Sequence, residues 1–176
     1  IHGPKGIGFC FVRGGLGVKP QILGGGQEWN MRAGTENILG ILGMGKAIEL
    51  VLQNFKEDSA NIIGIKKYAI DKLSQAFSDI VFLGRSGDLE KSLFTVLNIG
   101  FPQDGATGML TFSLDMKKIA ASGGSACNSG SNQGSHVIRA LGPDFASYVP
   151  CRISFSKFNT KEDIDAFVQA IKEIRA

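Results

Sequence analysis

Two adjoining stretches of the chain, residues 36–55 and 58–77, repeat apolar side chains at the spacing of an α-helix. A helix with one apolar face has to bury that face against another layer of structure, so these stretches constrain the fold more than any other part of the sequence. The charged residues 56–58 separate the two patterns. We therefore expect two long amphipathic helices, with a break and a domain boundary between them.

Shorter apolar runs alternate with further helical patterns. Strands are predicted at residues 6–13, 80–83, 93–99, 119–121 and 152–155, and helices at residues 107–114, 136–141 and 161–174. Cys10 is expected to pack in the core, and Thr160 is expected to cap the last helix. This alternation predicts an α/β or α+β fold with helices packed on a sheet.

The charge pattern excludes several classes of protein. The net charge of +3 is spread along the chain without a dense block of Lys and Arg, which argues against a nucleic-acid surface. Residues 66–67 and 117–118, which are pairs of lysines, are expected to lie on solvated faces. No apolar run long enough to cross a bilayer and no signal peptide are predicted, so no membrane partner is expected.

The three cysteines, Cys10, Cys127 and Cys151, suggest neither a disulfide framework nor a zinc site. No metal is expected, and the compartment is expected to be a reducing cytoplasm, or an organelle matrix if a targeting segment precedes the chain.

Residues 122–135 form a Gly/Ser-rich run with Cys127 inside it. Such a segment has almost no apolar surface to bury, and ordering its backbone costs about 1–2 kcal/mol per residue, so it should stay mobile unless something holds it. A thiol on a mobile tether suits a nucleophile that takes a group at one place and delivers it at another. The alternative is that Cys127 is an incidental small residue in an exposed linker.

A second glycine-rich segment, residues 23–37, ends just before the first helical pattern and contains Arg32 and Thr35. Glycines let the backbone approach a ligand closely, and the start of a helix favours a phosphate. Thr35 is equally suited to be the N-cap of the helix that follows.

Four stretches together resemble the cysteine desulfurases of the NifS/IscS type, which are pyridoxal-phosphate (PLP) enzymes of fold type I in the class V aminotransferase family. They are residues 2–8, 24–37, 122–131, and 152–154 with 159–163. The resemblance covers nearly the whole chain. It implies the C-terminal part of such an enzyme, with residues 1–56 as the end of the PLP-binding domain and an interdomain helix, and residues 57–176 as a small domain carrying the Cys loop.

The resemblance implies a role for three residues. Cys127 matches the nucleophile that takes sulfur from L-cysteine and becomes a persulfide, leaving L-alanine. Thr35 matches the threonine that binds the PLP phosphate of the other subunit in a homodimer. Arg152 matches the arginine that pairs with the substrate carboxylate, a role that suits the planar guanidinium. Without the resemblance, Arg152 would be interpreted as part of a surface ion pair.

The lysine that forms the Schiff base with PLP would lie immediately before Ile1, so we expect a fragment that is inactive by itself. The implied sulfur acceptors are iron–sulfur scaffold proteins or thiolation carriers. Trp29, Lys118 and Ser156 depart from the residues that are common in the family. Two alternatives remain: another PLP-dependent aminotransferase of the same superfamily, and a non-catalytic module that carries sulfur.

Overall fold

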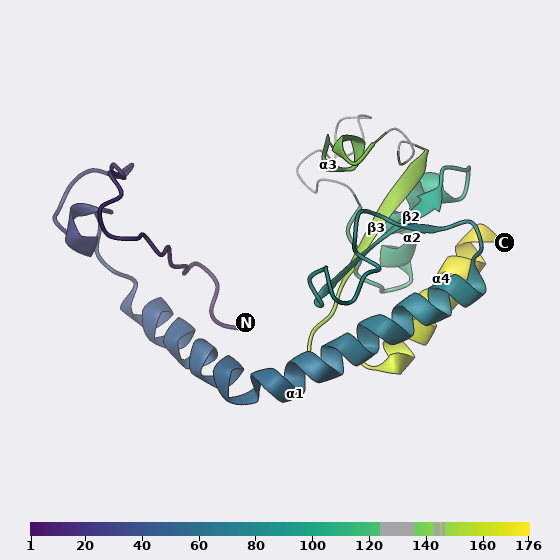
Figure 1. Cartoon of the computed structure of the whole chain (residues 1–176), viewed down its shortest axis with the longest axis horizontal. Coiled ribbons are helices and arrows are strands. Elements are labelled where there is room, and N and C mark those ends of the chain that lie inside the picture. Colours follow the sequence, from purple (N-terminus) through teal and green to yellow (C-terminus); the bar gives the residue numbers. More distant parts are fainter. Residues whose placement is uncertain (124–135, 143–144, 146) are drawn as a thin grey trace. The chain divides into compact units, whose positions relative to one another are not determined.

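The computed structural model describes residues 1–123, 136–142, 145 and 147–176 (Figure 1). It divides into two compact units, Ile1–Phe55 and Lys56–Ala176. Most of the Gly/Ser-rich run, including Cys127, lies outside the described residues.

Helix α1 extends from Ile38 to Ala76, so the two predicted helices form one element. The predicted break at residues 56–58 is wrong. Lys and Glu have high helix propensity, and neither glycine nor proline interrupts the chain at this point, so a run of charges alone does not end a helix. Asp58 instead forms an ion pair with Lys157 at 3.4 Å.

By length and composition α1 could cross a membrane, which contradicts the expectation that no run is long enough. Its most apolar stretch has a mean hydropathy of 1.3. Only 11% of this stretch is buried in the structure, so core packing does not account for it, and a single helix of this kind is weak evidence for a membrane span. The C-terminal half of α1, by contrast, is a core helix. Ile62, Ile65, Ala69 and Leu73 of this half lie in the core of the second unit.

The first unit contains little regular structure before α1. The predicted strand at residues 6–13 is absent, and Cys10 is exposed instead of packed in a core. A strand needs a neighbour to bond its backbone, and the described part of this unit offers none. The 3-10 turn η1 (Glu28–Asn30) has positive φ angles at all three residues, and its Trp29 is exposed.

The second unit contains a sheet of three antiparallel strands in the order β1-β2-β3: β1 (Val81–Phe82), β2 (Val96–Pro102) and β3 (Tyr148–Ser154). These correspond to predicted strands, whereas residues 119–121 form no strand. The remaining elements are η2 (Thr107–Met109), α2 (Leu110–Met116), α3 (His136–Ala140) and α4 (Lys161–Arg175). The predicted combination of helices with a sheet is confirmed.

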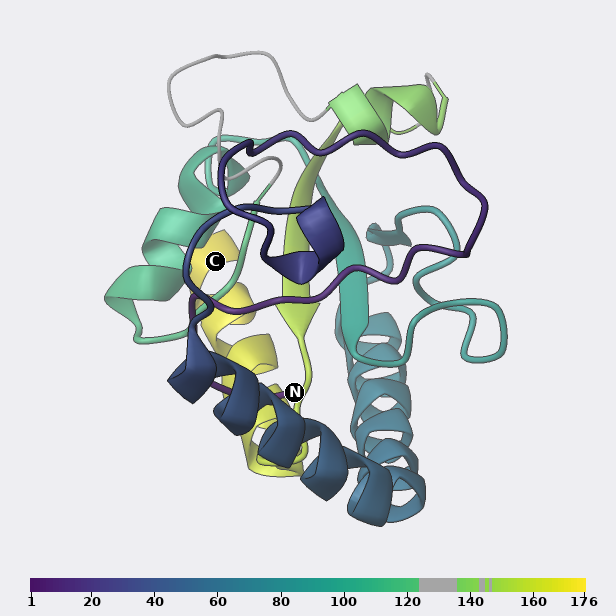
Figure 2. The ribbon, with the colours of Figure 1, turned by 90° about the vertical axis from the view of Figure 1, so that its left-hand side faces the viewer.

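One face of the sheet carries the core. The C-terminal half of α1 and helix α4 both contribute to it and lie along the strands (Figure 2). Helix α4 begins as predicted, because Asp163 Oδ2 accepts a hydrogen bond from Thr160 N–H at 3.0 Å within a capping box. The sheet side of this core consists of Leu97, Ile99, Phe101, Cys151 and Ile153.

Lys66 is fully buried, so the prediction that it lies on a solvated face is wrong. It occupies the helical face of Ile62, Ala69 and Leu73, which are four, three and seven residues away. Its Nζ donates hydrogen bonds to Ser92 Oγ at 2.7 Å and to Leu93 O at 2.9 Å. The amine thus connects α1 to the segment that leads into β2.

Candidate functional site

The sheet has a second face, opposite the core, and Arg152 lies on it. Successive residues of a strand point to opposite faces, so the buried neighbours Cys151 and Ile153 place Arg152 on the outer side. Its side chain is exposed. The local sequence alone therefore fixes the orientation of this guanidinium relative to the core.

Ser122, at the start of the Gly/Ser-rich run, is bonded directly to Arg152. Ser122 N–H donates to Arg152 O at 2.9 Å, and Arg152 N–H donates to Ser122 O at 2.7 Å. The side chains also meet, since Arg152 Nη2 donates to Ser122 Oγ at 3.3 Å. The two residues are 30 positions apart in the sequence. Periodicity does not reveal such a pairing, and sequence reasoning missed Ser122 as a site residue.

Gly123 lets the chain pass close to its neighbours as the run leaves the sheet. A Cβ at this position would lie 3.0 Å from Thr111 Cγ2 and 3.3 Å from Pro150 O. Any larger residue would press on backbone that does not move easily. Residues 122 and 123, with which the run begins, therefore lie tightly against β3, beside Arg152.

Cys127 cannot be placed, since it lies outside the described residues. It follows Ser122 by five residues. Five residues extend over at most about 18 Å, so covalent geometry alone limits how far Cys127 can be from Ser122.

Thr35 lies in the first unit, exposed, three residues before α1 begins. It is not the N-cap that the sequence allowed. Asn37 has that role, because its Oδ1 accepts a hydrogen bond from Gly40 N–H at 3.0 Å. The hydroxyl of Thr35 is therefore not used to cap the helix.

The residues around Thr35 fit a phosphate. Arg32 Nη1 donates to Ala33 O at 2.8 Å and would lie 2.9 Å from a Cβ on Gly34, so a guanidinium sits beside Thr35 in the loop. The start of α1 adds the positive end of a helix dipole. A hydroxyl, a cation and a helix N-terminus are groups that can bind a phosphate. Thr35 and Arg152 belong to different units.

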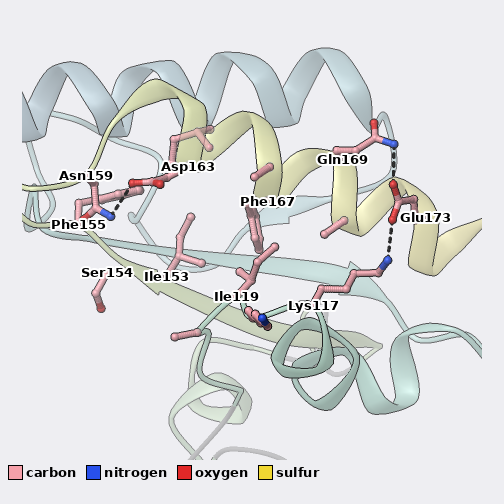
Figure 3. Close-up of a pocket in the computed structure, with 15 residues that line it drawn as sticks. Lys117, Ile119, Ile153, Ser154, Phe155, Asn159, Asp163, Phe167, Gln169 and Glu173 are labelled. Atoms are coloured by element: carbon pink, nitrogen blue, oxygen red, sulfur yellow. Dashed lines mark hydrogen bonds and ion pairs between the residues drawn. The ribbon is translucent and has the colours of Figure 1, made fainter.

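A hollow of about 800 Å³ lies in the second unit. It is bordered by α4, the end of β3 and residues 117–120 (Figure 3). Three of its four charged side chains have local partners: Lys117 Nζ pairs with Glu173 Oε2 at 2.6 Å, and Asp163 Oδ2 accepts a hydrogen bond from Asn159 Nδ2 at 3.2 Å. Of the predicted site residues, neither Thr35 nor Arg152 lines it. In the described part of the chain, no cluster of His, Cys, Asp and Glu could hold a metal ion.

Cys151 is expected to be inert toward thiol reagents in the folded protein. Burial raises its pKa to about 12, so at pH 8 about one molecule in ten thousand carries the thiolate. Cys10 is exposed and should react. Peptide masses after brief treatment with iodoacetamide check this: Cys10 should be modified and Cys151 should not, and both should be modified in urea. Modification of Cys151 at the rate of Cys10 in the native protein would contradict the buried position.

The family model described as aminotransferase class V matches residues 1–167. The chain belongs to this family. Class V aminotransferases of this kind depend on PLP, and the fit of a phosphate at Thr35 is consistent with that dependence.

Individual relatives of this class V chain are cysteine desulfurases. The cysteine desulfurase of Gluconacetobacter diazotrophicus is 38% identical over 100% of the chain, which spans 43% of that protein. The cysteine desulfurase IscS of Dictyoglomus turgidum is 35% identical over 99% of the chain and is likewise covered to 43%. A solved NifS-like protein superposes with a TM-score of 0.79 at 30% identity, over 99% of the chain and 43% of its own length. The chain thus spans less than half the length of the relatives it matches, and the resemblance seen in the four sequence stretches is confirmed.

Proposed function

We propose that the complete protein is a PLP-dependent cysteine desulfurase, which converts L-cysteine into L-alanine and leaves the sulfur as a persulfide on Cys127. The observation that carries the proposal is the double backbone hydrogen bond between Ser122 and Arg152. It holds the start of the segment that carries Cys127 beside the guanidinium of Arg152, which can bind a carboxylate. Desulfuration requires a thiol near the bound amino acid, and this arrangement can supply one. Transamination does not require a thiol.

Each residue has a distinct task in this proposal. Arg152 holds the substrate carboxylate through the fork of its guanidinium. Thr35 binds the phosphate of the PLP that the other subunit of a homodimer holds. PLP, when bound, supplies an electron sink that weakens the Cβ–S bond of the substrate. Residues 1–56 then complete the PLP-binding domain and residues 57–176 form the small domain, and the division of the structure between Phe55 and Lys56 supports this assignment.

Transfer of sulfur from L-cysteine to Cys127 needs no added oxidant. The thiolate of Cys127 attacks the substrate sulfur, a new S–S bond forms, and the Cβ–S bond breaks with its electron pair passing to carbon. A proton then completes the methyl group of alanine. One L-cysteine and one thiol thus become one L-alanine and one persulfide. A scaffold protein for iron–sulfur clusters or a thiolation carrier would receive the sulfur.

The test is the stoichiometry of products formed from L-cysteine by the complete, PLP-loaded protein in the presence of dithiothreitol. We expect alanine and sulfide in equal amounts. Transfer of the amino group to a 2-oxo acid without release of sulfide would instead support an aminotransferase of the same superfamily and overturn the proposal.

Arg152→Lys should raise the KM for L-cysteine by about tenfold and change kcat less. Lysine keeps the charge but loses the bidentate fork that matches a carboxylate. Steady-state kinetics measure this effect, with Arg85→Lys as the control because Arg85 is an exposed arginine in the loop after β1. An unchanged KM for Arg152→Lys would remove Arg152 from substrate binding.

A further inference from the structure

The outer face of the sheet carries a second polar side chain, Asn98 of β2. It is paired with Arg152 of β3 in the antiparallel register. Both hydrogen-bonding groups of the Arg152 backbone point away from β2, because they are bonded to Ser122. Asn98 and Arg152 therefore form a non-hydrogen-bonded pair, the type in which cross-strand side chains lie closest, with Cβ atoms about 4.5–5.5 Å apart.

Asn98 has a buried acceptor that nothing satisfies. Its Oδ1 is inaccessible to solvent and has no hydrogen-bond partner among the residues that the structure describes. Leaving such a group unpaired costs about 1–3 kcal/mol. An orphaned polar atom of this kind is rare in a folded protein and requires an explanation.

The neighbours of Asn98 on this face favour one residue as the donor to its Oδ1. On the β1 side, Leu83 N–H donates to Asn98 O at 2.9 Å, which continues the register of β1 and places an apolar side chain there. Along β2, the nearest residues on the same face are Val96 and Gly100. Ser86 Oγ donates to Asn98 O at 2.8 Å, which uses its one proton. Ser154, diagonal on β3, offers a single hydroxyl, whereas Arg152, directly opposite, brings several N–H donors to this position.

Arg152 has donors to spare. A guanidinium offers five N–H groups, and within the described residues the side chain of Arg152 makes one hydrogen bond, the long contact of 3.3 Å to Ser122 Oγ. An orphaned acceptor thus faces a guanidinium whose donors are mostly uncommitted.

We propose that Asn98 is a positioning residue for Arg152: its Oδ1 accepts a hydrogen bond from the guanidinium and fixes the plane in which the fork meets the substrate carboxylate. The inference rests on the proposed function, since it gives Arg152 the carboxylate as its ligand. A fixed plane lowers the entropy that is lost when the substrate binds, so Asn98 acts on substrate affinity more than on the chemical step.

The first test is the kinetics of Asn98→Leu and Asn98→Asp in the complete, PLP-loaded protein. Leucine has a similar volume and removes the acceptor, and we expect the KM for L-cysteine to rise about tenfold with kcat changed less than about twofold. Aspartate would pair with Arg152 and compete with the substrate carboxylate, so the rise should be larger. Ser154→Ala is the matched control, because Ser154 is the exposed polar residue diagonal to Asn98 on the same face.

A double-mutant cycle separates positioning from a general structural role. If Asn98 acts through Arg152, Asn98→Leu should raise KM much less in an Arg152→Ala background than in the wild type. Equal effects in the two backgrounds would overturn the inference. If the leucine variant does not fold, the same double-mutant cycle can be measured with Asn98→Asp in place of Asn98→Leu.

A third measurement needs no turnover and distinguishes failure of this inference from failure of the proposed function. Phenylglyoxal modifies free guanidinium groups, and peptide masses give the rate at Arg152. This rate should increase several-fold in Asn98→Leu, because the arginine loses its acceptor. If the wild type releases no sulfide but Arg152 reacts faster with phenylglyoxal in Asn98→Leu, the desulfurase proposal fails and the Asn98–Arg152 pair stands. If phenylglyoxal modifies Arg152 at the same rate in both proteins, the pair is rejected.

Discussion

Replacing Cys127 by serine is expected to reduce the release of sulfide from L-cysteine by at least about 1,000-fold in the complete, PLP-loaded protein. A hydroxyl at this position is almost entirely protonated and is a far weaker nucleophile toward sulfur than a thiolate. Losses of this size are typical when the nucleophile of an enzyme is removed. Sulfide and alanine are measured together, because both should fall.

Cys10→Ser is the control for this experiment, since Cys10 is the exposed thiol of the first unit. It should leave the rate within about twofold of the wild type, as surface substitutions usually do little to a distant site. Peptide masses after a single turnover without dithiothreitol should show the Cys127 peptide heavier by one sulfur atom. A Cys127→Ser protein that releases sulfide at the wild-type rate would refute the assigned nucleophile.

The second large effect concerns stability. Lys66→Ala should lower the free energy of unfolding by about 3 kcal/mol. The substitution removes a fully buried side chain, leaves a cavity, and takes the donor away from Ser92 Oγ and Leu93 O. Urea unfolding followed by circular dichroism measures the loss. Lys67→Ala on the same helix is the control, because Lys67 is exposed.

Lys66 should also make the stability depend on pH. Burial lowers its pKa below the ordinary value of 10.5, against a weaker opposing effect of the Asp88 carboxylate. Between the lowered pKa and 10.5 the unfolded chain binds more protons at this site than the folded protein does. Stability contributed by Lys66 therefore rises as pH increases through this window and is lost as pH falls through it.

Lys66→Met tests this dependence. Methionine fills most of the volume but carries no titrating group, so its unfolding free energy should rise less between pH 7 and pH 10 than that of the wild type. Parallel curves for the two proteins over this range would show that Lys66 does not titrate with folding.

The limits of sequence reasoning follow from particular residues. The end of β3 and the start of α4 were predicted well, because alternation around Arg152 and the pairing of Thr160 with Asp163 are local features. The strand at residues 6–13 and the buried position of Cys10 were wrong, because a strand depends on a neighbour that periodicity cannot supply. Lys66 was predicted to be solvated because it is charged, and this was wrong. Its spacing from Ile62 and Ala69 already indicates the buried face of the helix.

The sequence by itself determined the family, which stretches are helical, the outward direction of Arg152 and, through the family resemblance, the candidate roles of Cys127 and Thr35. These follow from motifs and from the periods of helix and strand, which act over a few residues. The tertiary structure decided that Ser122 is bonded to Arg152, that Asn98 lies opposite it, that Asn37 and not Thr35 caps α1, and that Lys66 lies in the core. Most of these depend on the register and packing of segments that are far apart in the chain, and long-range pairing of that kind leaves no local trace in a single sequence.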